Sequence, residues 1–259
     1  AALKGANEIA LSNIIGSNMF NLLMVIGICA IINPILVSKD LYKRDFPLCI
    51  LFTIIVTLMV LERQLQRFDG IIMLIAFVAF MFILTKSALK SRKQAISEED
   101  TSEIKAYSPL KSFILIAVGL IGIAFGGQIV VDNACNIASL FGLSQTLIGL
   151  TIVACGTSLP ELVTSIVAAG KGENDLALGN VVGSNIFNLL FILGISATIH
   201  PIGGPGNLII TNSLIDLIIL SIVTILFFVL VWTKKTVNRW EGASVVIIYL
   251  AYLVYIIIR

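Results

Sequence analysis

Long apolar runs separated by short polar segments account for most of this chain. Eight runs reach or approach the length of a membrane span, at about residues 9–33, 46–62, 70–90, 110–132, 144–170, 176–199, 208–232 and 240–258. A transmembrane helix needs about 20 mainly apolar residues. Strands of outer-membrane barrels alternate in polarity, whereas a run such as IIMLIAFVAFMFIL does not. The pattern predicts an all-α, polytopic membrane protein.

Composition excludes several other classes of protein. Of the 259 residues, 58% are hydrophobic and 12% are charged, whereas soluble domains are about 45–50% apolar and about 25% charged. Water-soluble globular and disordered chains are thereby excluded. The net charge of +2 is small and its basic residues are dispersed, so nothing indicates a nucleic-acid partner. The cysteines lack metal-binding spacing. We therefore expect them to be small, buried apolar side chains; they are Cys29, Cys49, Cys135 and Cys155.

The basic residues predict how the spans are oriented, because cytoplasmic loops retain lysine and arginine. Alternate loops hold 13 of the 17 basic residues, in the segments 39–44, 86–111, 171 and 234–239. We expect these loops on the cytoplasmic side and the carboxy terminus outside. The polar segment 91–108 is then the main cytoplasmic loop. It divides the chain into an incomplete first half, residues 1–90, and a complete second half, residues 109–259.

The chain contains an internal repeat. Residues 1–35 match residues 168–202 without a gap at an offset of 167, and 21 of the 35 positions are identical. Equivalent positions lie five spans apart. Because this number is odd, the second copy is inverted in the membrane relative to the first. Inverted repeats with broken helices near the bilayer midplane are typical of secondary transporters. The first copy has no counterpart of the 144–170 span, and we therefore expect about eight helices of a ten-helix protein.

One acidic residue lies near the middle of a predicted span. Glu161 ends the segment G-T-S-L-P-E, residues 156–161, in which Gly156 and Pro160 interrupt the helical hydrogen bonds. The interruption frees backbone carbonyls from about Ala154 onward and places them beside the hydroxyls of Thr157 and Ser158. Carboxylate, hydroxyl and carbonyl oxygens suit calcium or sodium. The alternative is a simple proline kink, which explains every feature except the glutamate.

The repeated motif G-S-N-x-F-N adds a second set of oxygen ligands. Its serine and second asparagine stand four residues apart and share one helix face; they are Ser17 and Asn21 in one copy, and Ser184 and Asn188 in the other. We expect the glycines of the motif, Gly16 and Gly183, to allow close helix contact. The first asparagines, Asn18 and Asn185, point elsewhere and are expected to bond between helices.

Two other polar residues have simpler interpretations. Asp216 follows a polar span entrance, so we expect a helix-start or interfacial role. His200, the only histidine, ends a span and aligns with Asn33 of the first copy. An interfacial cap is therefore favoured over catalysis. An intramembrane enzyme, with Glu161 as base and Ser158 as nucleophile, lacks a poised partner and is disfavoured.

The segments at 156–161, 179–188 and 12–21 resemble the alpha repeats of the sodium/calcium exchanger family, in the cation/calcium antiporter superfamily. The resemblance implies a prokaryotic-type antiporter with an inverted-repeat exchanger fold that exchanges sodium for calcium by alternating access. It implies cation ligands at Ala154 (through its carbonyl), Thr157, Ser158, Glu161, Ser184, Asn188, Ser17 and Asn21. The family's second key glutamate would precede Ala1 and is not in this sequence.

The expected function is calcium/sodium antiport in the plasma (inner) membrane. The partners are calcium and sodium ions and the lipid bilayer, no cofactor is expected, and we expect a monomer. Coupling to potassium stays open, because family members differ near Asn188. The alternatives are a proton/calcium antiporter, in which Glu161 titrates, and a transport-inactive fragment.

Overall fold

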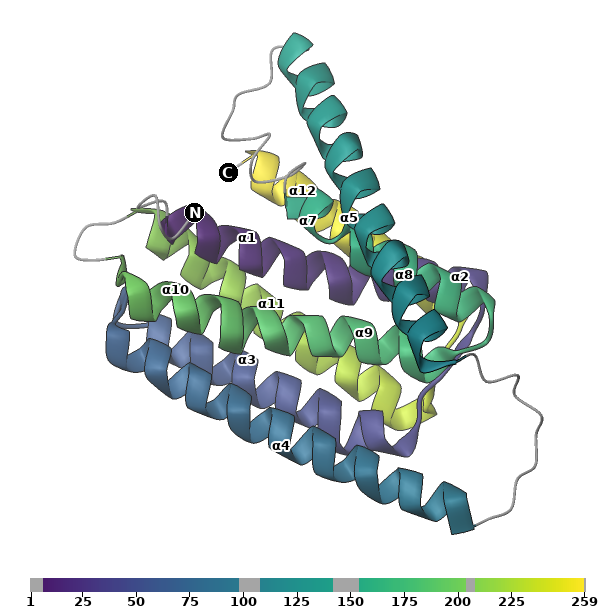
Figure 1. Cartoon of the computed structure of the whole chain (residues 1–259). Helices are drawn as coiled ribbons and strands as arrows, with labels where there is room; N and C mark the ends of the chain where they lie inside the picture. The colour runs from purple at the N-terminus through teal and green to yellow at the C-terminus, as the bar shows by residue number, and fades with distance from the viewer. Residues whose placement is uncertain (1–6, 98–107, 142–153, 204–207, 259) are drawn as a thin grey trace.

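The computed structural model describes residues 7–97, 108–141, 154–203 and 208–258, and it is almost entirely helical (Figure 1). The first half contains α1 (Asn7–Met19), the π-helical segment η2 (Phe20–Val25), α2 (Ile26–Ile32), the π-helical segment η3 (Leu41–Asp45), α3 (Phe46–Val60) and α4 (Arg67–Ser97). The second half contains α5 (Pro109–Leu140), α7 (Ala154–Thr157), α8 (Leu159–Gly170), α9 (Asn174–Phe187), the π-helical segment η5 (Asn188–Ile192), α10 (Leu193–Ile199), α11 (Leu208–Lys234) and α12 (Arg239–Ile258). The all-α class predicted from the hydropathy pattern is confirmed.

Six helical stretches of the described residues are long and apolar enough to cross a membrane. They are Leu11–Ile32, Arg67–Lys90, Pro109–Leu140, Asn174–Ile199, Asn212–Lys234 and Arg239–Ile258. The predicted span at 46–62 corresponds to α3, which has 15 residues. Of the predicted span at 144–170, residues 144–153 lie outside the described residues. Helices α4 and α5 continue past their predicted ends, so α4 takes in residues 91–97 of the predicted loop.

Four two-residue strands tie the ends of the helices together. Strand β1 (Ile35–Leu36) pairs antiparallel with β4 (Thr236–Val237), and β2 (Gln64–Leu65) pairs antiparallel with β3 (Ile202–Gly203). The first pair joins two loops predicted to be cytoplasmic, and the second joins two loops predicted on the opposite side. The structure therefore brings together loops that the charge pattern assigns to the same side.

Close glycine contacts repeat in the two halves. A Cβ atom on Gly242 of α12 would lie 2.7 Å from the carbonyl oxygen of Gly27 in α2, and one on Gly70 of α4 would lie 2.6 Å from that of Gly194 in α10. Gly27 and Gly194 are equivalent at the offset of 167. Each helix that follows a repeated motif therefore packs backbone to backbone against a helix of the other half, as an inverted repeat requires.

The expected close contact at Gly183 is wrong. Within the described residues, a Cβ atom on Gly183 would meet no atom within 4 Å. Helices α1 and α9 are instead joined at their crossing by the side chains of Asn18 and Asn185, each of which donates to the backbone of the other helix. The two asparagines bond between helices, as the sequence predicts.

The two repeated motifs lie in the core of the bundle. The largest fully buried side chains include Leu11, Ile15 and Met19 of α1 and Leu178 and Ile186 of α9. In contrast, α5 stands away from the bundle along much of its length (Figure 1), and apolar side chains cover its exposed surface. Exposed apolar side chains of this kind suit a lipid environment.

Candidate cation site

The helix that carries Glu161 is broken immediately before it. Helix α7 ends at Thr157, Ser158 leaves the helical conformation with φ −102° and ψ 6°, and α8 begins at Leu159. Pro160 has no N–H group and occupies the first turn of α8, where helices tolerate proline. The break predicted from the G-T-S-L-P-E segment is confirmed. It puts the carboxylate of Glu161 in the first turn of a helix, where the helix dipole favours negative charge.

Gly156 has a packing role that the sequence did not indicate. A Cβ atom at this position would collide with the side chain of Val131 in α5. The glycine therefore allows α5 to approach the break closely, in addition to loosening the chain before Pro160.

The carboxylate of Glu161 is incompletely paired. Ser184 Oγ of α9 donates to Glu161 Oε1 at the long distance of 3.5 Å. Glu161 Oε2 is buried and has no hydrogen-bond partner among the described residues. A buried carboxylate without a partner is unfavourable by several kcal/mol or so in a low-dielectric interior. This oxygen is therefore suited to a cation.

A second contact joins the broken helix to the first repeat. The hydroxyls of Ser17 in α1 and Thr157 in α7 lie 3.2 Å apart, and either of them can donate. Four residues after Ser17, in η2, Asn21 has no exposed surface, and its Oδ1 has no partner among the described residues. Two buried oxygens without partners, Asn21 Oδ1 and Glu161 Oε2, thus belong to the set of residues predicted to bind cations.

Asn21 and Asn188 lie in the π-helical segments that follow α1 and α9. The two segments begin at Phe20 and at Asn188, and both end at equivalent positions, Val25 and Ile192. Single-turn π-helical segments inside α-helices are frequent at functional sites. The repeat therefore extends to an irregularity of the backbone that sequence spacing did not reveal.

The structure joins most of the predicted ligands by hydrogen bonds. Thr157 contacts Ser17, Ser184 contacts Glu161, and both Asn21 and Asn188 bond to the pair Asn18 and Asn185. The other two predicted ligands flank the break: Ser158 is buried within it, and Ala154 is the first residue of α7.

Asn180 of α9, which the sequence did not single out, bonds to the helix that carries Glu161. Its Nδ2 lies 3.2 Å from the carbonyl oxygen of Glu161, and 2.9 Å from both Thr164 Oγ1 and Ser165 Oγ. It holds the start of α8 against α9. In its counterpart in the first copy, Asn13, the side-chain oxygen is buried without a partner among the described residues. The identity of these two residues in the repeat was the available signal.

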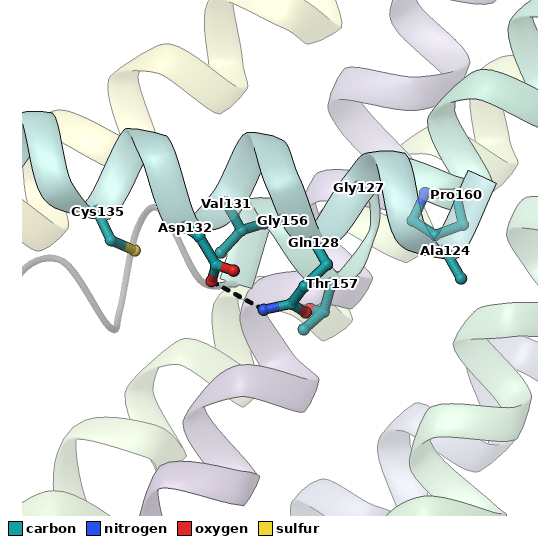
Figure 2. Close-up of a pocket in the computed structure, with 9 residues that line it drawn as sticks. All are labelled: Ala124, Gly127, Gln128, Val131, Asp132, Cys135, Gly156, Thr157 and Pro160. Atoms are coloured by element: carbon teal, nitrogen blue, oxygen red, sulfur yellow. Dashed lines mark hydrogen bonds between the residues drawn. The ribbon is translucent and has the colours of Figure 1, made fainter. Parts of the chain in front are cut away.

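A pocket of about 370 Å³ lies between α5 and the break, beside Thr157 (Figure 2). Gln128 and Asp132 of α5 line it, and Gln128 Nε2 donates to Asp132 Oδ1 at 2.8 Å. The predicted span ended at Asp132, but α5 continues for eight more residues to Leu140. A carboxylate and an amide of α5 therefore line the same pocket as Thr157.

The remaining sequence interpretations have mixed outcomes. His200 occupies the C-cap position of α10, as the sequence predicts, with nearly the same backbone angles as Asn33 at the end of α2. A helix-start role for Asp216 is wrong, because α11 begins at Leu208 and Asp216 is buried within it. All four cysteines are free thiols; two are buried and two are partly exposed.

The chain is similar to a protein family, to individual membrane proteins and to a solved structure. The family model described as sodium/calcium exchanger protein matches residues 1–86 and 111–258. The putative antiporter CaxA of Alkalimonas amylolytica is 35% identical over 260 residues, covering 97% of this chain and 79% of that protein. Inner membrane protein YrbG of Escherichia coli (strain K12) is 34% identical over 239 residues, covering 91% and 72%. A structure of the sodium-calcium exchanger NCX_Mj superposes with a TM-score of 0.79 at 30% identity, covering 98% of this chain and 78% of that one.

Proposed function

The chain belongs to the sodium/calcium exchanger family, and we propose that the oxygen cluster around Glu161 is where it binds calcium and sodium in turn. It is a multi-pass membrane protein that exchanges sodium for calcium. The proposed ligands are the carboxylate of Glu161, the hydroxyls of Thr157, Ser158, Ser17 and Ser184, the side-chain oxygens of Asn21 and Asn188, and the carbonyl of Ala154.

The observation that carries the proposal is that two of the four buried side-chain oxygens without partners among the described residues, Glu161 Oε2 and Asn21 Oδ1, belong to the proposed ligands. Buried polar groups are nearly always hydrogen-bonded, so exceptions need an explanation. Both oxygens belong to residues whose other side-chain polar atom is already engaged, by Ser184 and Asn185 respectively. A cation would satisfy both oxygens without displacing either hydrogen bond.

The chemistry of the cluster suits hard cations. Calcium takes six to eight oxygen ligands at about 2.3–2.6 Å, and the proposed set consists entirely of oxygens. Within the described residues, no group of three histidine, cysteine or acidic side chains is placed to hold a metal. Soft metals such as zinc prefer nitrogen and sulfur ligands, so neutral oxygens around one carboxylate favour calcium and sodium.

Exchange follows from the electrostatics of the cluster. An empty site leaves the Glu161 carboxylate uncompensated in a low-dielectric environment, which is unfavourable. One sodium ion neutralises the single carboxylate of the proposed set, and a neutral site crosses between the two access states more readily than a charged one. Calcium can therefore leave only if sodium ions replace its charge, and the two ions move in opposite directions.

The test is calcium uptake into proteoliposomes driven by an outward sodium gradient. Glu161→Gln keeps the shape of the side chain and removes its charge. We expect uptake to fall by about tenfold or more, since an interaction with a charged group contributes roughly 1.5–3 kcal/mol. Glu173→Gln, at an exposed position before α9, is the matched control and should leave uptake unchanged.

Two results would overturn the assignment. One is uptake at nearly the wild-type rate in Glu161→Gln. The other is calcium uptake by the wild-type protein that is as fast with a potassium gradient as with a sodium gradient, because sodium would then not be the coupling ion.

A further inference from the structure

Four asparagine side chains meet where α1 crosses α9. Asn18 Nδ2 donates to the backbone carbonyl of Asn185, and Asn185 Nδ2 donates to the backbone carbonyl of Asn18, each at 3.2 Å. Both side chains are almost completely buried, with 1% and 3% of their surface exposed. A backbone carbonyl accepts hydrogen bonds and cannot donate them. Each of these two amides must therefore point its nitrogen at the opposite backbone.

The fixed orientation of the Asn18 and Asn185 amides also fixes the orientation of the neighbouring amides of Asn188 and Asn21. With the nitrogens of Asn18 and Asn185 committed, their Oδ1 atoms face Asn188 and Asn21. Asn21 Nδ2 donates to Asn185 Oδ1 at 3.2 Å, and Asn188 Nδ2 donates to Asn18 Oδ1 at 3.0 Å. If the side-chain amide of Asn21 or Asn188 flipped, its oxygen would face the acceptor oxygen of Asn185 or Asn18, and a buried hydrogen bond would be lost.

The side-chain amides of Asn21 and Asn188 can therefore adopt only one of their two orientations. In that orientation, the Oδ1 of Asn21 points away from Asn185 and is the buried oxygen without a partner. The side chains of an asparagine and of its flipped form occupy the same space, so packing alone does not choose between them. Here the backbone carbonyls of Asn18 and Asn185 decide the choice.

We propose that Asn18 and Asn185 are positioning residues that orient the ligand amides of Asn188 and Asn21, so that these present oxygen rather than nitrogen to the cation. The proposal rests on the proposed function, since it takes Asn21 and Asn188 as ligands. An amide nitrogen carries partial positive charge and would repel calcium or sodium. Residues outside the ligand set that orient ligands in this way strongly affect metal affinity.

The arrangement also crosses between the repeats. Asn185 of the second repeat orients Asn21 of the first, and Asn18 of the first repeat orients Asn188 of the second. Each half of the protein therefore sets the ligand geometry of the other half. If these asparagines served only to hold the helices together, they would also lie between membrane helices. The effects of Asn185 and Asn21 on calcium affinity would then not need to be coupled.

The test is a double-mutant cycle on apparent calcium affinity, measured by sodium-driven uptake in proteoliposomes across a range of calcium concentrations. The variants are Asn185→Ser, Asn21→Ala and the two combined. We expect Asn185→Ser to weaken apparent calcium affinity by about tenfold, with a smaller change in maximal rate. The double variant should be no weaker than Asn21→Ala alone, because Asn185 acts through Asn21.

The equivalent cycle with the roles of the two repeats exchanged, Asn18→Ser with Asn188→Ala, tests the same proposal if Asn185→Ser fails to fold. Ser196→Ala is the control for loss of a buried polar group: Ser196 is buried and donates to Ile192 within its own helical stretch. It should leave calcium affinity unchanged. Thermal unfolding in detergent, measured on all variants, separates loss of stability from loss of affinity.

Three outcomes would overturn the proposal. Affinity losses that add in the double variant would mean that Asn185 acts independently of Asn21. An unchanged calcium affinity in Asn185→Ser, with only the maximal rate or stability lowered, would leave a structural role. Asn21→Ala without effect on affinity would remove Asn21 from the cation site and so contradict the proposed ligand set itself.

Discussion

The hydroxyls of Thr157 and Ser17 lie 3.2 Å apart, although the two residues are separated by 140 positions in the sequence. One stands at the end of α7, just before the break of the second repeat, and the other lies on the buried motif helix of the first. Their contact shows that the oxygen cluster is shared between the two halves of the protein.

Removal of either hydroxyl should weaken calcium binding moderately. We expect Ser17→Ala and Thr157→Val each to raise the calcium concentration for half-maximal uptake by about two- to tenfold, since one neutral hydrogen-bonding group contributes about 0.5–1.5 kcal/mol. Thr53→Val is the control, because the buried Thr53 hydroxyl donates to the backbone oxygen of Cys49 within its own helix. An effect of the control as large as that of Ser17→Ala would argue for general loss of packing.

Asn180 should matter for transport because it anchors the start of α8. Its Nδ2 contacts the carbonyl oxygen of Glu161 and the hydroxyls of Thr164 and Ser165. In Asn180→Leu these acceptors lose their shared donor, which should cost about 1–3 kcal/mol of stability and weaken calcium affinity. Asn180→Gln, which retains the amide, should restore part of both. Equal defects in the two variants would show that the amide is not the important group.

Glycine at position 70 should be required for stability. A Cβ atom on Gly70 would lie 2.5 Å from Thr198 Oγ1 and 2.6 Å from the backbone oxygen of Gly194. The backbone oxygen cannot move independently, so Gly70→Ala should destabilise the protein by about 1–3 kcal/mol. Gly126→Ala is the matched control, since a Cβ atom there meets no described atom within 4 Å. Thermal unfolding in detergent should show a lower midpoint for Gly70→Ala only.

The orientation of the protein in the membrane can be tested by cysteine labelling. The pairing of β1 with β4 predicts that Ser38→Cys and Lys234→Cys react with an impermeant thiol reagent from the same side. Arg63→Cys, next to β2, should react from the opposite side. The charge pattern predicts that the first side is cytoplasmic. The background should lack Cys135 and Cys155, which are partly exposed, whereas Cys29 and Cys49 are buried.

Labelling of Ser38→Cys and Arg63→Cys from the same side would contradict the predicted alternation of the loops. Labelling from opposite sides, but with Ser38→Cys accessible from outside, would keep the fold and reverse only the predicted orientation.

Much of the fold could be predicted because its signals are local. Apolar runs of the length of a bilayer mark the helices, and Pro160, four residues after Gly156, marks the break, since proline removes a backbone donor in any fold. The odd number of spans between equivalent positions predicted an inverted arrangement, and the paired strands and paired glycine contacts agree with it. Glu161 stood out because a carboxylate in a membrane helix is unfavourable unless it has a function.

Other features depended on contacts that no local pattern encodes. Gly183 in the repeated motif has open space beside it, whereas Gly27 and Gly242, in unremarkable apolar runs, touch backbone to backbone. Glycine has the same effect on local helix propensity at all three positions, so only the neighbouring helix distinguishes them. Asn180 was missed for the same reason: its three acceptors lie on another helix.

The sequence by itself thus determined the membrane helices, the repeat, the break and the chemical type of the proposed ligands, because hydropathy, proline and charge act within a few residues. Only the tertiary structure decided which oxygens are left without partners and which way the amides face. The amide orientations arise where the first repeated motif crosses the second, between residues 164 to 170 positions apart. An amide is both donor and acceptor, and its role is settled only by the group that lies opposite it.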